Sequence, residues 1–344
     1  MLGAGVLGLL ALSGCGPVQL GGPAEYTPPP PGIDDLYRAD LLALLDRAIA
    51  GTATVVGSDS GTGDGADGGS SPALATALGI LQEALPVQRS ALLTGAETER
   101  EAQAEQDPDP AATPSPAPTA VPADLSALIT LLVELRELGT DAARQVSGSL
   151  ARPVAAITAH TAWTLRRLAS ASGQGEAVPA VRTAKEIEPT REVPTTDPPS
   201  IGATSDFHTT IETAQDEEWY AAYVHEVLAA RTDDEDEQAG HLSMTETHRA
   251  RAAVLGEIAE AEGAPVVTRE AVYPLPGGVL DERAAAAMPT ELSRALLLAH
   301  LALTGAAPFA VRSTAIAAAL AEAEVLAGLG ESLSPLPSLE PETD

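Results

Sequence analysis

The chain has little of several residue types, and each scarcity excludes a class of protein. A single cysteine among 344 residues rules out an internal disulfide framework and a zinc site made of thiolates. Phe, Trp and Tyr number only 2, 2 and 5, so the cores must be built from aliphatic residues, which favours helices. Lys and Arg number 19 against 49 Asp and Glu, and the net charge of −30 excludes nucleic acid as a partner, because phosphates are repelled.

The motifs of common enzyme classes are also absent from the sequence. There is no Gly-x-Ser-x-Gly elbow, no His-Glu-x-x-His and no Gly-Lys-Ser/Thr phosphate loop. Gly3, Gly5 and Gly8 spell Gly-x-Gly-x-x-Gly, but no strand precedes them, so a dinucleotide site lacks its required context. We therefore favour a protein without enzymatic activity and keep an enzyme as the alternative.

The N-terminus carries the clearest motif. Residues 1–14 form an uncharged apolar run, shorter than the roughly 20 residues that cross a bilayer. Leu12, Ser13, Gly14 and Cys15 then resemble the lipobox of bacterial lipoprotein signals. The resemblance implies cleavage before Cys15 and fatty-acyl chains such as palmitate on that residue, which would anchor the protein to the extracytoplasmic face of the cell membrane. The basic residues that normally open such signals are missing, so either the true start codon lies upstream or the given sequence begins late.

Breaker-rich stretches divide the rest of the chain. Residues 57–71 are rich in Gly, Asp and Ser, and residues 107–122 and 173–200 are rich in Pro, a composition typical of linkers and long loops. The expected organisation is a signal peptide at 1–15, a tether at 16–32, an N-terminal helical domain at 33–172, a Pro-rich linker at 173–208, a four-helix bundle at 209–331 and an acidic tail at 332–344.

The hydrophobic period between the breakers is helical throughout, so the sequence predicts an all-α fold. Eight helical segments are expected: 33–50, 72–105 interrupted at Pro86, 124–145, 149–170, 211–231, 239–262, 282–304 and 308–329. Four of them fall in each half. Gly263, Gly305 and Gly330 stand where helices are expected to end.

The C-terminal half resembles a known family. The residues that carry the resemblance are Glu217 to Tyr223, Thr247 to Arg251, Gly263 to Pro265 and Tyr273 to Pro276, in this order. They are similar to the ferritin-like domain of unknown function found in actinobacterial envelope proteins, over about residues 210–330. The resemblance implies an up-down four-helix bundle, in agreement with the periodicity.

Ferritin-like folds often bind two metal ions, so the ligands were sought residue by residue. A di-iron centre needs a Glu from each of two helices and Glu-x-x-His from each of the other two. Glu246 and His248 are two positions apart, about 200° around a helix axis, and the last helix carries Glu322 and Glu324 without a histidine. The full set is therefore missing.

A partial set of ligands remains. Glu218, His225 and Glu226 share one side of the first C-terminal helix, and His248 lies on the apolar stripe of the next. We favour a buried carboxylate–histidine pair that fixes helix register, and keep as the alternative an atypical iron or manganese site made of Glu218, Glu226 and His248. The remaining histidines, His160, His208, His241 and His300, are expected to be ordinary positions.

These expectations combine into one functional hypothesis. The chain is expected to be a lipid-anchored protein of the cell envelope, attached to the membrane through Cys15 and free of cofactors. Its bundle would contact another envelope protein, of a kind that the sequence does not identify. The alternative is a metal-binding or oxidoreductase protein with an atypical carboxylate–histidine site.

Overall fold

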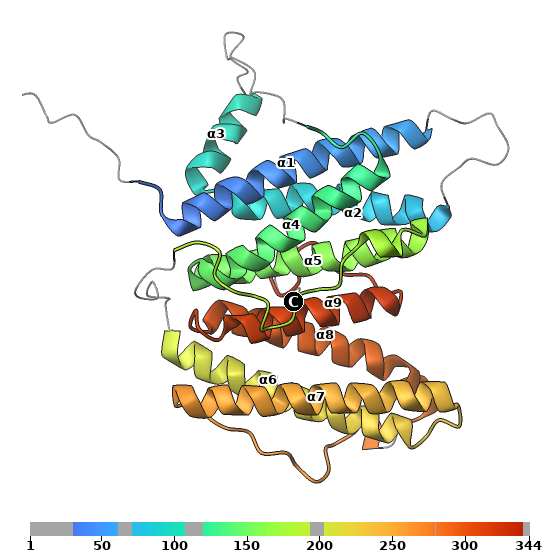
Figure 1. Ribbon diagram of the computed structural model, residues 1–344. Helices are drawn as coiled ribbons and strands as arrows, with labels where there is room; N and C mark the ends of the chain where they lie inside the picture. Colours follow the sequence, from blue (N-terminus) through green and yellow to red (C-terminus); the bar gives the residue numbers. More distant parts are fainter. Residues whose placement is uncertain (1–29, 61–70, 107–119, 193–202, 279, 340–344) are drawn as a thin grey trace, which may run out of the picture. The chain divides into compact units, whose positions relative to one another are not determined.

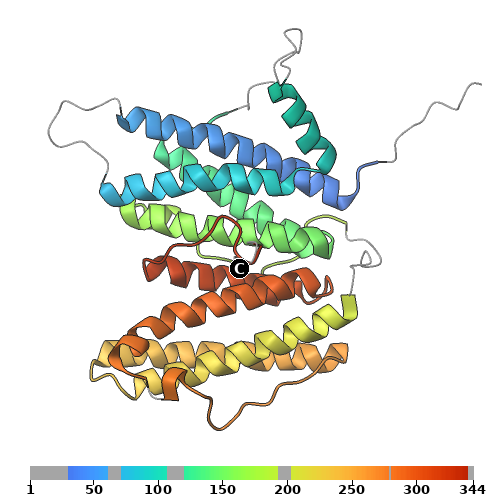
Figure 2. The ribbon, with the colours of Figure 1, turned by 180° about the vertical axis from the view of Figure 1, so that it is seen from behind.

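The computed structural model describes residues 30–60, 71–106, 120–192, 203–278 and 280–339, and in these ranges every regular element is a helix. The all-α prediction is thus confirmed. The described residues from 32 onward form one compact unit. Figures 1 and 2 show it from opposite sides. The helices are α1 (Ile33–Ser60), α2 (Pro72–Leu92), α3 (Gly95–Gln106), α4 (Leu125–Gln145), α5 (Gly148–Ser172), α6 (Ala203–Ala229), α7 (Glu235–Glu262), α8 (Glu282–Ala306) and α9 (Arg312–Gly328), with short 3₁₀ turns at Gly175–Ala177 and Pro276–Gly278.

Helices α1, α2, α4 and α5 form a bundle. Helix α1 packs against α2 and α4, and α5 packs against the same two helices. Leu41, Leu81, Leu132 and Trp163, one from each helix, are buried in a common core. Side-chain caps set several boundaries: Ser71 accepts a hydrogen bond from the Leu74 amide, and Asp124 accepts one from the Ala127 amide. Pro86 lies inside α2 rather than interrupting it.

Helix α1 raises the question of a membrane span. Among the helices that the structure describes, only Ile33–Ser58 is long and apolar enough to cross a membrane by length and composition. One face of this helix, with Tyr37, Leu41 and Leu45, is buried against α2 and α4. The apolar residues of this face belong to the core of the folded unit. The apolar run 1–14 lies outside the described residues.

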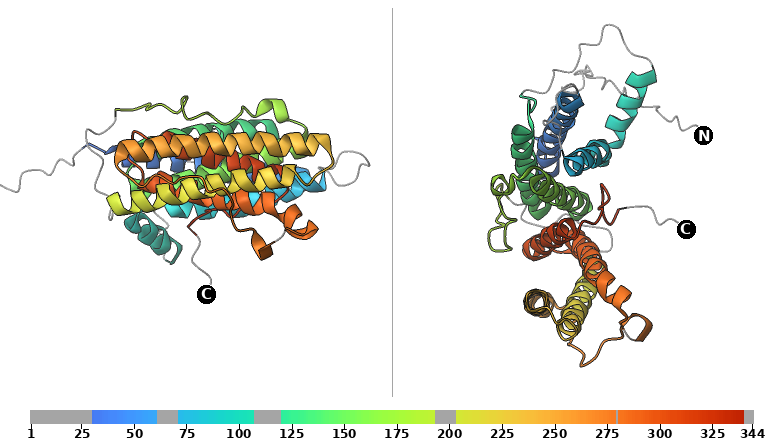
Figure 3. Two further views of the ribbon diagram at one scale, coloured as in Figure 1. Left: turned by 90° about the horizontal axis from the view of Figure 1, so that it is seen from below. Right: turned by 90° about the vertical axis from the view of Figure 1, so that its right-hand side faces the viewer.

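The C-terminal helices form a helical bundle that shares a core with the first one. Helix α6 packs against α7 and α8, and α8 packs against α9. Helices α8 and α9 also pack against α5, and Leu297, Leu301, Leu320 and Leu326 belong to the same core cluster as the N-terminal helices. Figure 3 shows α8 and α9 between α5 and the pair α6 and α7. The two segments that we expected to be separate domains are therefore joined by continuous apolar packing.

Glycines make the closest helix contact between α5 and α8. A Cβ added to Gly148 would lie 2.3 Å from the Gly305 carbonyl oxygen, so neither helix backbone has room for a side chain there. Gly305, expected at or near the end of a helix, is the second-last residue of α8 and lies at this crossing. Gly263 ends α7 in the left-handed conformation, as predicted.

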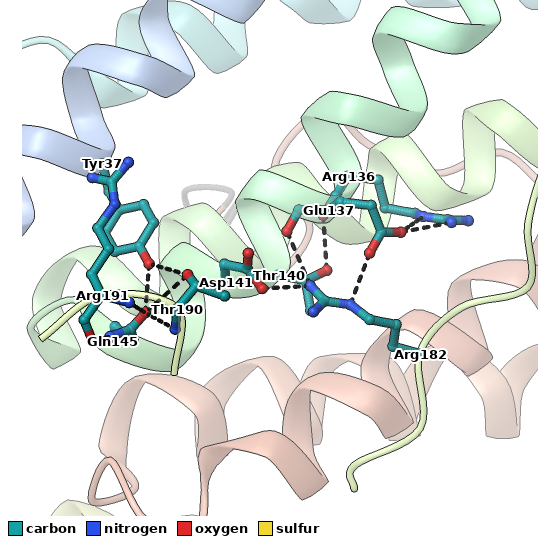
Figure 4. Close-up of polar contacts among 9 residues, drawn as sticks. All are labelled: Tyr37, Arg136, Glu137, Thr140, Asp141, Gln145, Arg182, Thr190 and Arg191. Carbon is teal, nitrogen blue, oxygen red and sulfur yellow. Dashed lines mark hydrogen bonds and ion pairs between the residues drawn. The ribbon is translucent and has the colours of Figure 1, made fainter. Parts of the chain in front are cut away.

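The expected linker at 173–208 includes a segment that is bound to α4. Arg182 forms ion pairs with Glu137 at 2.8 Å and Asp141 at 2.7 Å (Figure 4). Arg136 donates a hydrogen bond to the Pro179 carbonyl oxygen. Further along, the Gln145 side chain accepts from the Thr190 amide. Helix α4 offers charged partners along its length, so residues 178–191 pack against it.

The tail is also held over its described part. Leu333 is buried, the Gln88 amide donates to the Pro335 carbonyl oxygen, and Arg152 donates to the Ser338 carbonyl oxygen. Residues 332–339, expected to be a solvated acidic tail, thus pack across α2 and α5.

Candidate functional site

A buried carboxylate occupies the middle of the C-terminal bundle. Glu218 of α6 is fully buried, and each of its oxygens accepts one hydrogen bond from a histidine. His248 of α7 donates through Nδ1 to Oε2 at 2.7 Å, and His300 of α8 donates through Nε2 to Oε1 at 2.7 Å. Three helices are thereby linked through one side chain.

A second carboxylate and an arginine complete the group. Arg251 of α7 lies 3.7 Å from Oε1 of Glu218 and 2.5 Å from Oε1 of Glu322, a fully buried residue of α9. We call Glu218, His248, Arg251, His300 and Glu322 the central polar cluster. It takes one or two residues from each of the four C-terminal helices, and its guanidinium lies between the two carboxylates.

Helical spacing brings these side chains inward. On α7 the buried positions are Thr245, His248, Ala252, Leu255 and Ala259, which repeat every three or four residues. Arg251 follows His248 by three positions and therefore reaches the same interior face. On α8, His300 follows the buried Leu296 by four residues and precedes the buried Thr304 by four.

The surroundings strongly favour the ionised form of Glu218. Burial alone would raise the pKa of this carboxyl, but the hydrogen bonds from His248 and His300 and the charges of His300 and Arg251 lower it to about 2. Burial would likewise lower the pKa of Arg251, yet the charges of Glu322 and Glu218 raise it. The cluster is therefore an ion-paired network in a low-dielectric interior.

Two more histidines extend the network toward the surface. The Nδ1 atoms of His225 and His241 are 3.0 Å apart, and the rings of His225 and His248 stack with centroids 5.5 Å apart. Burial, together with the charges of His248 and His241, lowers the pKa of His225 to about 3. His241 borders a surface cavity of about 470 Å³. A line of imidazoles thus runs from this cavity to Glu218.

The structure brings together only part of the predicted metal set. Glu218 and His248 meet, as the spacing predicted. Glu226 does not join them, because it lies at the surface and forms ion pairs with Arg249 at 2.5 Å and Arg269 at 3.1 Å. The prediction of a site shared by Glu218, Glu226 and His248 is wrong for Glu226. Glu226 follows the buried His225 by one residue, about 100° around the helix axis, and this rotation places it in solvent. Cys15 lies outside the described residues.

The residues present do not fit a di-metal centre. In the part of the chain that the structure describes, no group of three or more His, Cys, Asp or Glu side chains is arranged to hold a metal ion. Both oxygens of Glu218 accept imidazole N–H groups, and the Arg251 guanidinium holds the position between Glu218 and Glu322. A divalent cation there would have to displace a fixed positive charge.

Sequence reasoning missed three members of the cluster, and Arg251 was noted only as part of the motif from Thr247 to Arg251. His300 was expected to be an ordinary position, but it lies on the buried stripe of α8 between Leu296 and Thr304, a signal that the periodicity contained. Glu322 was noted only for lacking a histidine partner. His160 is buried in the first bundle beside Trp163, and burial lowers its pKa to about 4, as befits a core histidine.

The comparisons with known proteins add one match. No curated protein and no solved structure matches the chain. Residues 210–341 match the model of a domain of unknown function, DUF4439. The match begins in α6 and runs past the end of α9, so it includes all five residues of the central polar cluster. The C-terminal part of the chain is thus similar to DUF4439, a family defined by sequence and not by a known activity.

Proposed function

We propose that this chain is a lipid-anchored protein of the extracytoplasmic face of a cell membrane, as in the actinobacterial envelope proteins that its C-terminal half resembles. Its ferritin-like bundle would serve as a non-enzymatic module that contacts another envelope protein. The lipobox at Leu12 to Cys15 supports the anchor, and two acyl chains on one cysteine give stable attachment.

The position of Arg251 is the observation that carries the non-enzymatic part of the proposal. Its guanidinium pairs with Glu322 and faces Glu218 where a ferritin-like bundle would otherwise place metal. The cluster therefore supplies its own cation. Its role is to hold α6, α7, α8 and α9 in one register, because any slip of a helix would leave a buried charge unpaired.

The rival function is metal binding or redox chemistry. It draws on one observation: Glu218, His248, His300 and Glu322 each come from a different helix, and Arg251 connects Glu322 to the carboxylate that both histidines contact. Iron or manganese would require Arg251 to move aside. The two functions therefore differ in whether the purified protein holds metal in stoichiometric amount.

Metal analysis separates these functions. The full chain, purified in neutral detergent, would be loaded with iron, manganese and zinc in turn and analysed by elemental mass spectrometry beside His248→Ala and Glu226→Gln. We expect less than one tenth of an equivalent of any metal in all three proteins. One equivalent in the wild type and in Glu226→Gln, lost in His248→Ala, would establish the rival.

The anchor has its own test. Cells expressing the full chain or Cys15→Ser would be labelled with a fatty acid, and the protein examined for incorporated label. We expect labelled wild type and unlabelled Cys15→Ser. Equal labelling of the two proteins, or no labelling of either, would contradict lipidation at Cys15.

A further inference from the structure

A cleft of about 700 Å³ lies where α5 and α9 end and α2 begins. Two adjacent arginines of α5, Arg166 and Arg167, line it, and small residues such as Ala73, Ala171 and Gly330 leave its interior open. None of its lining residues belongs to the central polar cluster.

The two arginines differ from most others in this chain. Arg89, Arg182 and Arg191 each form ion pairs with carboxylates, as expected when Asp and Glu number 49 and Lys and Arg only 19. Within the described ranges, Arg166 and Arg167 form no such ion pair. The charge of Arg166 lowers the pKa of Glu324 without a direct ion pair, but burial has the larger effect and raises that pKa. The cleft thus holds two cationic groups in a strongly acidic protein.

The framework of the cleft holds one guanidinium in place. Arg167 lies over the ring of Trp163, with its Cζ 5.6 Å from the ring centroid. The indole N–H of Trp163 donates to the Glu331 carbonyl oxygen at 3.0 Å, which fastens the turn after α9 to α5. Gly330 in that turn has a φ of +81°, and a Cβ added there would lie 3.7 Å from Nη1 of Arg167. Since the stacking face is occupied by Trp163, the N–H edge of Arg167 is left to bind a ligand.

We propose that this cleft binds a phosphoryl group, free or on a lipid headgroup. Guanidinium forks match the oxygens of phosphate in bidentate fashion, and two neighbouring positive charges favour a group with more than one charged oxygen. The N-terminus of α2, where Ala73 lies, adds partial positive charge to the same cleft. The small side chains of the walls leave room for the organic part of a phosphorylated molecule.

The test uses the full chain in neutral detergent and titrates it with inorganic phosphate and with glycerol phosphate by calorimetry. The variant Arg166→Gln/Arg167→Gln removes both guanidinium groups from the cleft. A matched control, Arg231→Gln/Arg283→Gln, removes the same charge from two other arginines that have no ion pair in the described ranges. In the lipid arm of the test, micelles containing phosphatidylglycerol compete with phosphate for the cleft. Micelles of phosphatidylcholine are the control.

We expect saturable binding of phosphate that weakens at least tenfold in Arg166→Gln/Arg167→Gln and less than twofold in the control. Competition by phosphatidylglycerol would identify a lipid headgroup as the source, and binding without competition would identify a soluble phosphate. Equal weakening in the two double variants would overturn the proposal, because only net charge would then matter. So would the lack of saturable binding by the wild type to every probe.

Discussion

At the scale of single residues, Glu218 is held by contacts on both of its oxygens. Both of its oxygens accept hydrogen bonds, and it is fully buried beside a guanidinium. Removing one partner of a buried ionic network costs more than the network contributes as a whole, because the remaining charges lose their compensation.

The first prediction concerns this carboxylate. Glu218→Gln replaces one acceptor oxygen by an amide that faces an imidazole N–H, and it leaves Arg251 with one carboxylate. We expect the free energy of unfolding to fall by about 3 to 5 kcal/mol. Glu226→Gln, which removes only exposed ion pairs, should cost under about 1 kcal/mol. Urea unfolding followed by circular dichroism measures both, and similar losses in the two variants would argue against the network.

The second prediction concerns pH. The pKa values of His225 and His160 are lowered by burial to about 3 and about 4, whereas in the unfolded chain these histidines titrate near 6.5. As pH falls below about 6.5, these histidines bind protons in the unfolded chain but not in the folded chain, so the free energy of unfolding falls. Glu218 adds a further loss below its unfolded value of 4.5, because its pKa in the fold is about 2.

Denaturation midpoints at pH 7.5, 5.5 and 4.5 measure this effect. Each histidine contributes a slope of up to about 1.4 kcal/mol per pH unit. The double variant His160→Asn/His225→Asn should flatten the dependence of stability on pH between pH 6.5 and 4.5. The variant has the same net charge as the wild type at pH 7, so the effect of net charge on stability is the same in both proteins. An unchanged slope in the double variant would contradict the assignment.

At the scale of elements, Arg312 joins the two bundles. The residue is buried at the start of α9 and donates to the Ala307 carbonyl oxygen at 2.7 Å and to the Val146 carbonyl oxygen. Val146 caps the end of α4, and Ala307 caps the end of α8. One guanidinium therefore satisfies carbonyl groups at two helix C-termini, where positive charge is favoured.

The third prediction follows from that position. Arg312→Ala should lower the free energy of unfolding by about 2 to 4 kcal/mol, because two buried carbonyl groups lose their donor. Arg312→Lys should recover less than half of the loss, since an ammonium group has no planar fork to reach both oxygens. Thermal unfolding of the three proteins checks this, and full recovery by lysine would mean that charge alone matters.

The fourth prediction concerns the segment at 178–191. The Gln145 side chain accepts hydrogen bonds from the backbone amides of Thr190 and Arg191 (Figure 4). The Arg191 guanidinium lies 3.9 Å from the centroid of the Tyr37 ring. Gln145→Ala should increase amide hydrogen exchange at least tenfold at Thr190 and Arg191, because these two N–H groups lose their acceptor. Exchange in α6 should not change. Unaltered exchange at Thr190 and Arg191 would show that the segment is held by other contacts.

At the scale of the whole molecule, the two bundles depend on one another. Helices α8 and α9 pack against α5, and Leu297, Leu301 and Leu320 are buried in a cluster with the N-terminal helices. A fragment that contains only α6 to α9 would expose this apolar face to water.

The fifth prediction is that residues 203–344 alone will not give a stable monomer. We expect the isolated fragment to aggregate or to bind a hydrophobic dye, whereas residues 30–344 should unfold in one cooperative transition. Gel filtration and calorimetry measure both. A monodisperse fragment with a cooperative transition of its own would show that the C-terminal bundle is autonomous, as the sequence-based division into domains implied.

Much of the architecture was determined by the sequence itself. Helical periodicity and the scarcity of aromatic residues predicted an all-α fold, and Gly263 marked a helix end that the structure reproduces. These signals are local, because a helix needs only its own backbone and one apolar face. The pairing of Glu218 with His248 was also predictable, since both lie on such a face.

Only the tertiary structure decided which partners meet. Glu218 and His300 are 82 positions apart, and Arg251 and Glu322 are 71 apart, so no spacing rule relates them. Glu218 and Glu226 lie at different angles around the axis of α6. Only the packing of α7 against α6 placed the first in the core and left the second in solvent. The contact of Gly148 with Gly305 depends in the same way on how α5 meets α8. Periodicity selects a face of each helix, and the choice of neighbour for that face is made by packing across the whole chain.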